Sequence, residues 1–286
     1  MLGTYHLTSL FDILNKIHFV YEPEQLWQFI LEQACKTLQS EAGTYFEESE
    51  NEQELKIRAS FGMDRTRLSE LPFRVGSGIC GWVAQYHQPA LVPDVRQDNR
   101  FNTAVDMMTG FTTRSVLCVP VLSQKRTYGV LEIMNKKNGP FNPADQEFMT
   151  LLGRQAAIAY QNLLLLAEVS QTKNLMESLV ENLSGGLIAM DAAGALTIVN
   201  PASIQLLMLA GKPTAGSPMM EVLRDHPWFI ETLQKTLTTR QTVSRQEIKI
   251  PIQGNPQRLG YTTILISDRE KKVLGAGIIF QKLSSP

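Results

Sequence analysis

The sequence predicts an α+β protein in which two antiparallel-sheet domains are joined by one long helix. Its 286 residues are enough for about two domains, and 43% hydrophobic against 19% charged residues allow a full core in each. Two groups of short apolar segments, typical of strands, flank a helical pattern that runs from 142 to about 183. We therefore expect a first domain at 1–160, a linker helix at 143–183 that overlaps its last helix, and a second domain at 184–286.

The first domain begins with two amphipathic helices, because apolar residues recur at helical spacing over 10–17 and 26–38. Pro23 is a good residue for the start of the second of these helices. Runs rich in Val, Leu and Ile predict the strands, which we place at 42–47, 55–60, 114–122 and 128–134. The intervening segment 64–113 has little periodicity, and a loop of that length in a compact domain is usually functional.

A glycine-rich run lies within this segment, with Gly76, Gly78 and Gly81 in the spacing Gly-x-Gly-x-x-Gly. That spacing also occurs in dinucleotide-binding folds, but neither the long helix nor the acidic residue that such folds need follows it here. The glycines are better interpreted as interrupting a strand and opening a short helix, which builds a lid over a pocket.

This run and the motifs that follow it resemble the GAF sensory domain. The features that carry this resemblance are Gly-Trp-Val-Ala at 81–84, Pro-Asp-Val at 93–95, Arg-Phe at 100–101 and a strand that opens with Arg-Ser at 114–115. A later set, Asn135-Lys136 followed by Phe141-x-x-x-Asp145, resembles the signature of GAF domains that bind cyclic nucleotides, although Gln146 stands where that pattern has Glu. Because GAF domains without a cyclic nucleotide share this signature, it supports the fold more than the ligand.

The resemblance implies a pocket for a small molecule beneath the glycine-rich run, with apolar walls and a few polar groups. The alternative for the polar residues is structural, with Asp94 and Arg100 capping the loop and Arg114 paired on the surface. The residues expected at the pocket are Ile79, Cys80, Trp82, Asp94, Arg100, Phe101, Asn102, Arg114 and Leu117.

The later motif is interpreted as a structural lock rather than as ligand contacts. Lys136 and Asp145 are expected to form an ion pair that holds the sheet to the exit helix. The lock residues are Asn135, Lys136, Phe141 and Asp145.

The sequence has no catalytic or metal-binding motif, so we expect no catalytic site, metal site or cofactor in this chain. The cysteines, Cys35, Cys80 and Cys118, are odd in number and lack paired spacing, which fits a reducing compartment. Cys80 is expected to be a small buried side chain, the default for a cysteine. The alternative is a reactive thiol, because Cys80 opens a helix, where the dipole lowers a thiol pKa. The four histidines form no catalytic or metal motif, and His226 precedes Pro227, where it is expected to cap a helix or face solvent.

The helical pattern contains no proline after 143 and only Gly153 as a weak point. Seven of ten seam positions are apolar, and Asn162 is the type of polar seam residue that fixes register, so we expect a homodimeric coiled coil. The alternative is that its first half packs on its own sheet. The seam positions are Leu151, Gln155, Ile158, Asn162, Leu165, Val169, Thr172, Met176, Leu179 and Leu183.

The second domain begins with a predicted hairpin of strands at 187–191 and 196–200, followed by a short helix that Asn200 caps. Three further strands are expected at 247–252, 260–266 and 273–283. This order resembles a PAS domain, as do three motifs. They are Asp191-x-x-Gly194, Asn-Pro-Ala at 200–202, and the ending at 277–284, where Lys282 replaces the usual Asp.

The two resemblances together imply a sensory input module that binds a small ligand or relays a conformational signal to a downstream kinase or effector domain. The model for this is the input region of a bacterial two-component sensor histidine kinase. The alternatives are an enhancer-binding transcription activator and an enzyme of cyclic-nucleotide turnover. A net charge of −1 predicts no nucleic-acid partner, and the lack of a long apolar run or a secretory signal predicts a cytoplasmic protein without a membrane contact.

Overall fold

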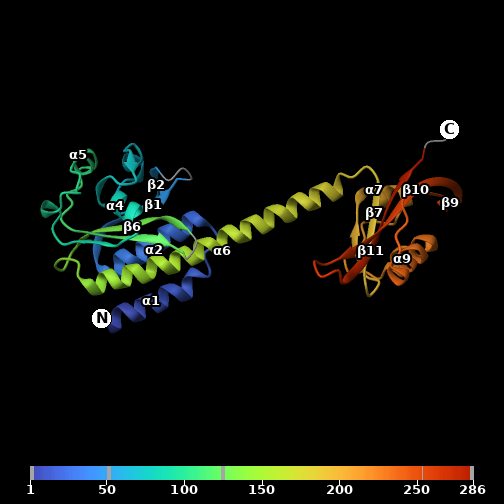
Figure 1. Ribbon diagram of the computed structural model, residues 1–286, viewed down its shortest axis with the longest axis horizontal. Coiled ribbons are helices and arrows are strands. Elements are labelled where there is room, and N and C mark those ends of the chain that lie inside the picture. Colours follow the sequence, from blue (N-terminus) through green and yellow to red (C-terminus); the bar gives the residue numbers. More distant parts are fainter. Residues whose placement is uncertain (1–2, 50–52, 124–125, 253, 284–286) are drawn as a thin grey trace. The chain divides into compact units, whose positions relative to one another are not determined.

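The computed structural model describes residues 3–49, 53–123, 126–252 and 254–283. Ser284, the last residue of the second domain's exit motif, lies outside this part. The chain separates into two compact units, Met1–Glu168 and Val169–Pro286, and each combines helices with an antiparallel sheet (Figure 1). The α+β class expected from the sequence is thereby confirmed.

The first unit is built on a six-stranded sheet in the order β3-β2-β1-β6-β5-β4, in which all neighbouring strands are antiparallel. The two central strands are therefore β1 and β6, which are far apart in the sequence. The strands are β1 (Ser40–Glu48), β2 (Glu54–Phe61), β3 (Phe73–Arg74), β4 (Ala90–Val92), β5 (Val116–Leu122) and β6 (Thr127–Lys136).

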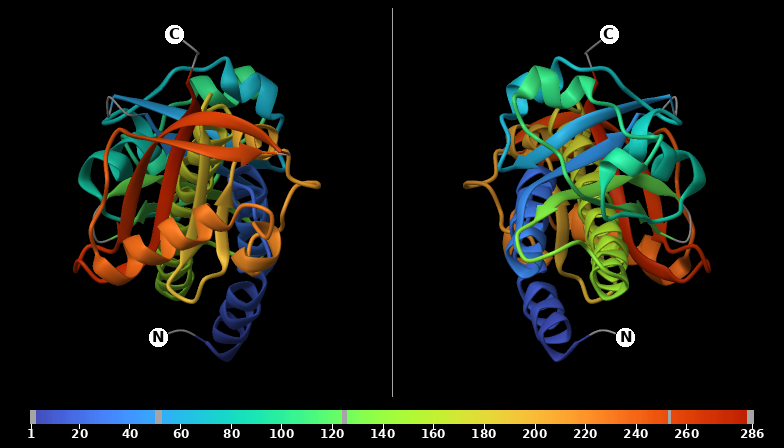
Figure 2. Two further views of the ribbon diagram at one scale, coloured as in Figure 1. Left: turned by 90° about the vertical axis from the view of Figure 1, so that its right-hand side faces the viewer. Right: turned by 90° about the vertical axis from the view of Figure 1, so that its left-hand side faces the viewer.

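Helices cover both faces of this sheet, because its central strands are apolar on both sides. Leu117, Leu131 and Tyr45 point into one core, whereas Phe46 and Val130 point into the other. On the first face lie α1 (Thr4–Ile17), α2 (Pro23–Leu38) and the first part of α6 (Pro143–Glu181) (Figures 1 and 2). On the second face lie α3 (Arg65–Ser69), α4 (Gly78–Tyr86), the short 3₁₀ helix η1 (Val95–Gln97) and α5 (Ala104–Thr109).

The long helix α6 has 39 residues. Asn142 caps it, because its Oδ1 accepts the backbone N–H of Ala144 at 2.8 Å and that of Asp145 at 3.1 Å. Phe148 and Leu152 are fully buried against the sheet, whereas almost all side chains beyond 160 are exposed. The helix thus has a packed first part and a largely uncovered second part.

The second unit has a five-stranded antiparallel sheet in the order β8-β7-β11-β10-β9. Phe229 and Phe280 are the largest side chains of its core. Asn200 caps the first helix, since its Oδ1 accepts the N–H of Ser203 at 3.0 Å. The elements are β7 (Gly186–Asp191), β8 (Leu196–Val199), α7 (Pro201–Leu207), α8 (Met219–Val222), α9 (Pro227–Thr239), β9 (Gln246–Ile252), β10 (Asn255–Ser267) and β11 (Val273–Lys282).

His226 differs from the expectation that it caps a helix or faces solvent. It is buried, its side chain makes no capping hydrogen bond, and its Nε2 contacts the carbonyl oxygen of Leu207 at 2.9 Å. The imidazole therefore satisfies a backbone acceptor inside the core of the second unit.

Candidate ligand-binding site

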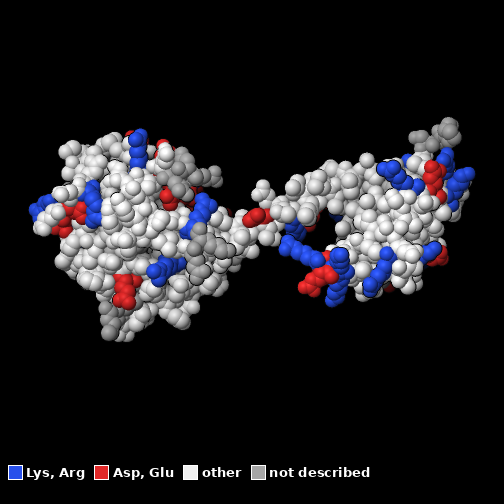
Figure 3. All heavy atoms as spheres, viewed as in Figure 1, with Lys and Arg blue, Asp and Glu red and all other residues white. Residues whose placement is uncertain are grey.

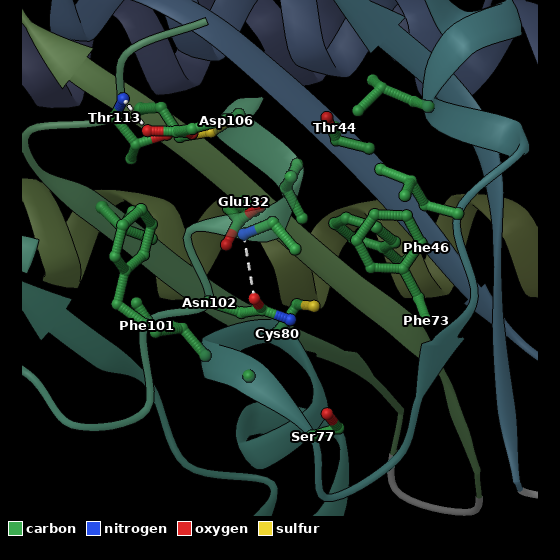
Figure 4. Close-up of a pocket in the computed structure, with 18 of the residues that line it drawn as sticks. Thr44, Phe46, Phe73, Ser77, Cys80, Phe101, Asn102, Asp106, Thr113 and Glu132 are labelled. Atoms are coloured by element: carbon green, nitrogen blue, oxygen red, sulfur yellow. Dashed lines mark hydrogen bonds between the residues drawn. The ribbon is translucent and has the colours of Figure 1, made fainter. Parts of the chain in front are cut away.

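A cavity of about 210 Å³ lies in the first unit, between β1 and β6 of the sheet and the helices α3, α4 and α5 that cover it. Most of its lining is apolar, and the rings of Phe46, Phe73 and Phe101 contribute to it (Figure 4). An apolar enclosure with a few polar groups is the usual form of a small-molecule site.

The glycine-rich run brings α4 against β3 and so closes one side of the cavity. Gly78 has φ of +72°, a conformation that other residues adopt reluctantly. A Cβ on Gly81 would collide with the carbonyl oxygen of Arg74, and the N–H of Gly76 donates to the carbonyl of Gly81 at 2.8 Å. This close approach places Ile79 and Cys80 on the cavity wall.

Four of the residues expected at the pocket line this cavity: Ile79, Cys80, Phe101 and Asn102. The amide of Asn102 also has a local role, because its Oδ1 accepts the N–H of Ala104 at 3.0 Å and so orders the start of α5.

Asp94 and Arg114 lie outside the cavity lining. Asp94 binds Arg96 through both carboxylate oxygens, and its Oδ1 also accepts the backbone N–H of Arg96 at the start of η1. The guanidinium of Arg114 donates to Glu41 at 2.8 Å, and both side chains are exposed to solvent. These contacts correspond to the structural alternative.

Arg100, Trp82 and Leu117 are also absent from the lining. Arg100 pairs with Asp98 at 2.7 Å, and its guanidinium carbon lies 4.4 Å from the ring centroid of Trp82. Leu117 is a correction to the expected pocket, because strand alternation turns it to the opposite face of the sheet, into the core beneath α2 and α6.

The four lock residues lie where the sheet meets α6. Lys136 Nζ donates to Asp145 Oδ2 at 2.6 Å, and the same oxygen accepts the N–H of Asn142 at 2.9 Å. Asn135 Oδ1 accepts the N–H of Arg114 at 2.7 Å, and Phe141 is buried in the core on that face. A fifth residue, His6, was not anticipated, and its Nε2 lies 3.4 Å from Asp145 Oδ1.

Glu132 is one of the cavity residues that the sequence reasoning missed, together with Thr44, Phe46, Phe73 and Asp106. It borders the cavity from the middle of β6, and burial raises the pKa of its carboxyl from 4.5 to about 7. The signal was a single charged residue within the apolar run Val-Leu-Glu-Ile-Met at 130–134. Such a residue interrupts a strand that is otherwise buried on both faces.

The cysteines are buried, and none of the three forms a disulfide. Burial raises the pKa of Cys35 to about 12 and the pKa values of Cys80 and Cys118 well above their usual range, with nearby Glu132 adding to the effect at both cavity-side thiols. The helix dipole therefore does not make Cys80 a thiolate.

Several charged side chains of the first unit form ion pairs at the surface, and Figure 3 shows acidic and basic groups interspersed on the face in view. Within the described ranges, no group of three or more His, Cys, Asp or Glu side chains is placed to hold a metal ion. In the same part of the chain, no helix is both long and apolar enough to cross a bilayer.

Comparison with known proteins identifies both units. Residues 22–160 match the GAF domain and residues 174–283 match the PAS fold. The GAF domain of a phosphoenolpyruvate-protein phosphotransferase from Coxiella burnetii superposes with a TM-score of 0.51 at 18% identity, covering 56% of this chain and 96% of that one. This similarity supports the fold alone.

Two curated relatives match a shorter stretch. A probable 3′,5′-cyclic phosphodiesterase, pde-5 of Caenorhabditis elegans, is 32% identical over 90 residues, which are 32% of this chain and 12% of the relative. The dual 3′,5′-cyclic-AMP and -GMP phosphodiesterase 11 of Drosophila melanogaster is 36% identical over 89 residues, 30% of this chain and 6% of the relative. The matches thus span only a small part of each relative's length. The two domain matches identify the chain as a GAF domain followed by a PAS domain, a tandem of sensory domains.

Proposed function

We propose that this chain is the input module of a signalling protein and that a small molecule bound in the GAF cavity is its signal. The observation that carries the proposal is the cavity itself, which is bordered on one side by the glycine-rich run and lined by aromatic and aliphatic side chains with a few polar groups. GAF and PAS are regulatory sensor domains, and we assign no catalysis to this chain.

The signal would pass from the cavity to α6 through β6. Glu132 and Met134 of this strand line the cavity, whereas Leu131 and Ile133 pack in the core shared with α2 and α6. Two residues beyond Met134, Lys136 is tied to the first turn of α6 by its ion pair. A ligand that favours one position of β6 would therefore shift the population of positions of the helix start.

We further propose a parallel homodimer along the second part of α6. Leu165, Val169, Met176 and Leu179 lie on the heptad seam, and each is more than half exposed in the single chain. Exposed aliphatic side chains repeating at 3.5 residues are the pattern that a coiled coil buries. Because the C-terminal ends of the two chains would point the same way in a parallel dimer, a change at the GAF domains would reach two downstream domains together.

The proposed output is a downstream histidine kinase, as the resemblance of the tandem implies. A second candidate is the regulation of cyclic-nucleotide turnover, which is favoured by the two phosphodiesterase relatives. In either case the chain would act by changing the geometry of the attached domain.

The test of the cavity uses a pair of substitutions on α5. Val105→Trp places an indole in the cavity lining, whereas Met108→Trp places the same side chain on an exposed position of the same helix. We expect native mass spectrometry of freshly purified chain to detect a retained small molecule in wild type and Met108→Trp but not in Val105→Trp. If the folded Val105→Trp variant also retains the molecule, the binding site lies outside this cavity.

A further inference from the structure

Glu132 stands opposite two residues of the neighbouring strands, on the cavity face of the sheet. In the antiparallel registers its Cα pairs with that of Thr44 on β1 and with that of Cys118 on β5. Thr44 and Glu132 both line the cavity (Figure 4). Directly opposed cross-strand side chains are neighbours on one face of a sheet, so the side chains of Glu132 and Thr44 border the same part of the cavity.

Neither polar group has a protein partner. Among the described residues, no hydrogen bond or ion pair joins the carboxylate of the partly exposed Glu132 to another protein group. The Oγ1 of Thr44, whose residue is 1% exposed, has no hydrogen-bond partner either. The other acidic residue of the lining is different, because Asp106 accepts the N–H of Thr113 at 2.7 Å and its hydroxyl at 2.6 Å. Buried charges in proteins are normally paired, so Glu132 lacks a counter-charge, which a bound ligand can supply.

The groups around Glu132 supply no cation. Cys118 of β5 and Cys80 of α4 face it as neutral thiols, because their pKa values are raised. The single cationic residue in the described lining is Arg74 of β3, which is exposed, and Arg100 behind Cys118 is already paired with Asp98. The interior of the cavity is therefore acidic, and an anionic ligand would have to approach an unpaired carboxylate.

The rest of the lining suits an organic cation. The ring centroids of Phe46 and Phe73 lie 4.9 Å apart, and Phe101 lines the cavity as well. Aromatic faces attract ammonium groups and also bury apolar carbon. At about 210 Å³ the space is smaller than the range of roughly 300 to 1,000 Å³ that drug-sized ligands occupy, so the ligand is a small metabolite.

We propose that the GAF cavity binds a small primary amine, whose ammonium group lies against Glu132 and Thr44 and whose apolar or aromatic body lies among the phenylalanine rings. An ammonium group has three donors, which match the two carboxylate oxygens and the hydroxyl. This assignment rests on the proposed function of the cavity and adds the chemical class of its ligand.

The test is a titration of the full chain with two matched sets of probes that differ only in the polar group. One set is 2-phenylethylamine, 2-phenylethanol and phenylacetate, and the other is 3-methylbutylamine, 3-methylbutanol and 3-methylbutanoate. We expect ligand-observed NMR and calorimetry to detect the amines and to find the alcohols and carboxylates at least tenfold weaker. In Glu132→Gln the affinity for the amine should fall about 10- to 100-fold, the cost of losing a charge-assisted hydrogen bond.

Matched variants separate the role of the carboxylate from folding. Thr44→Val keeps the shape and should weaken amine binding a few-fold, and Glu24→Gln removes an exposed carboxylate of α2 and should leave binding unchanged. Wild-type affinity for the amine should rise about tenfold from pH 6 to pH 8, because Glu132 with a pKa of about 7 ionises over this range. Glu132→Gln should lose this dependence.

Equal or tighter binding of the alcohols or carboxylates, unchanged amine binding in Glu132→Gln, or no amine binding at all would overturn the assignment. The proposed function fails separately. If wild type retains a molecule that Val105→Trp does not, and that molecule is not an amine, the cavity is a ligand site and only the amine class is wrong. If Val105→Trp changes nothing, the cavity itself is not the site.

Discussion

Replacing Glu132 by Gln should stabilise the ligand-free GAF domain at alkaline pH and leave its stability almost unchanged near pH 4. Glutamine has nearly the same shape as the glutamic acid side chain, but it cannot ionise. The substitution therefore removes the one consequence of burial that depends on pH, which is the cost of an unpaired charge beside the cavity.

The size of the effect follows from the pKa of Glu132, which burial raises from 4.5 to about 7. Between these two values the folded chain still holds a proton that the unfolded chain has already lost, so the stability of the wild type falls as pH rises through this window. The loss is complete above pH 7. At about 1.4 kcal/mol for each pKa unit, it amounts to about 3 kcal/mol.

Urea unfolding at pH 4, 6 and 8 measures this difference directly. Trp27 and Trp82 report on the GAF domain once the PAS tryptophan is removed by Trp228→Phe, since the chain has three tryptophans. The free energy of unfolding of Glu132→Gln should exceed that of the parent by about 3 kcal/mol at pH 8 and by little at pH 4. Glu24→Gln is the control. A difference that does not change with pH, or a Gln variant that is less stable at pH 8, would refute the interpretation of Glu132 as a buried and unpaired acid.

Two further outcomes are expected. Lys136→Met should lower the free energy of unfolding of the GAF domain by about 3 to 5 kcal/mol, because it removes the ammonium group that pairs with the buried carboxylate of Asp145 at 2.6 Å. Lys16→Met, at an exposed position, should have almost no effect in the same urea titration. Combined replacement of Leu165 and Leu179 by Glu should convert the proposed dimer to a folded monomer by light scattering, and a variant that stays dimeric would show that the helix seam does not hold the assembly.

The long strands and helices could be predicted because their signals are local. The apolar run at 128–134 and the long helical pattern are repeated over enough residues to show their period. The segment 64–113 contains α3, α4 and α5, each of nine residues or fewer, and these are too short for a period to emerge. Their positions depend instead on tertiary contacts, such as the backbone approach at Gly81.

The site was harder to predict because the expectation favoured charged residues in loops. Asp94 pairs with Arg96, and Arg100 pairs with Asp98. In each pair the two residues are two positions apart, and this spacing is visible in the sequence. Glu132 has no such partner two residues away, and it stands where its neighbours are all apolar. A charged residue that breaks a buried strand was thus a better indicator of the cavity than the charged residues of the loop.

The two interpretations of α6, packing on its own sheet and pairing with a second copy, do not compete for the same surface. At 100° per residue, the buried positions Phe148, Leu152 and Ala156 lie on the side of the helix roughly opposite to the seam positions Ile158 and Leu165. Ile158 is accordingly 48% exposed, although the residues two positions earlier and one position earlier are fully buried. The helix can therefore stay packed on the GAF sheet while its other side contacts a partner. Any rotation of α6 that follows a shift of β6 would then turn the seam against that partner, which is the kind of motion that a continuous helix transmits to the domain that follows it.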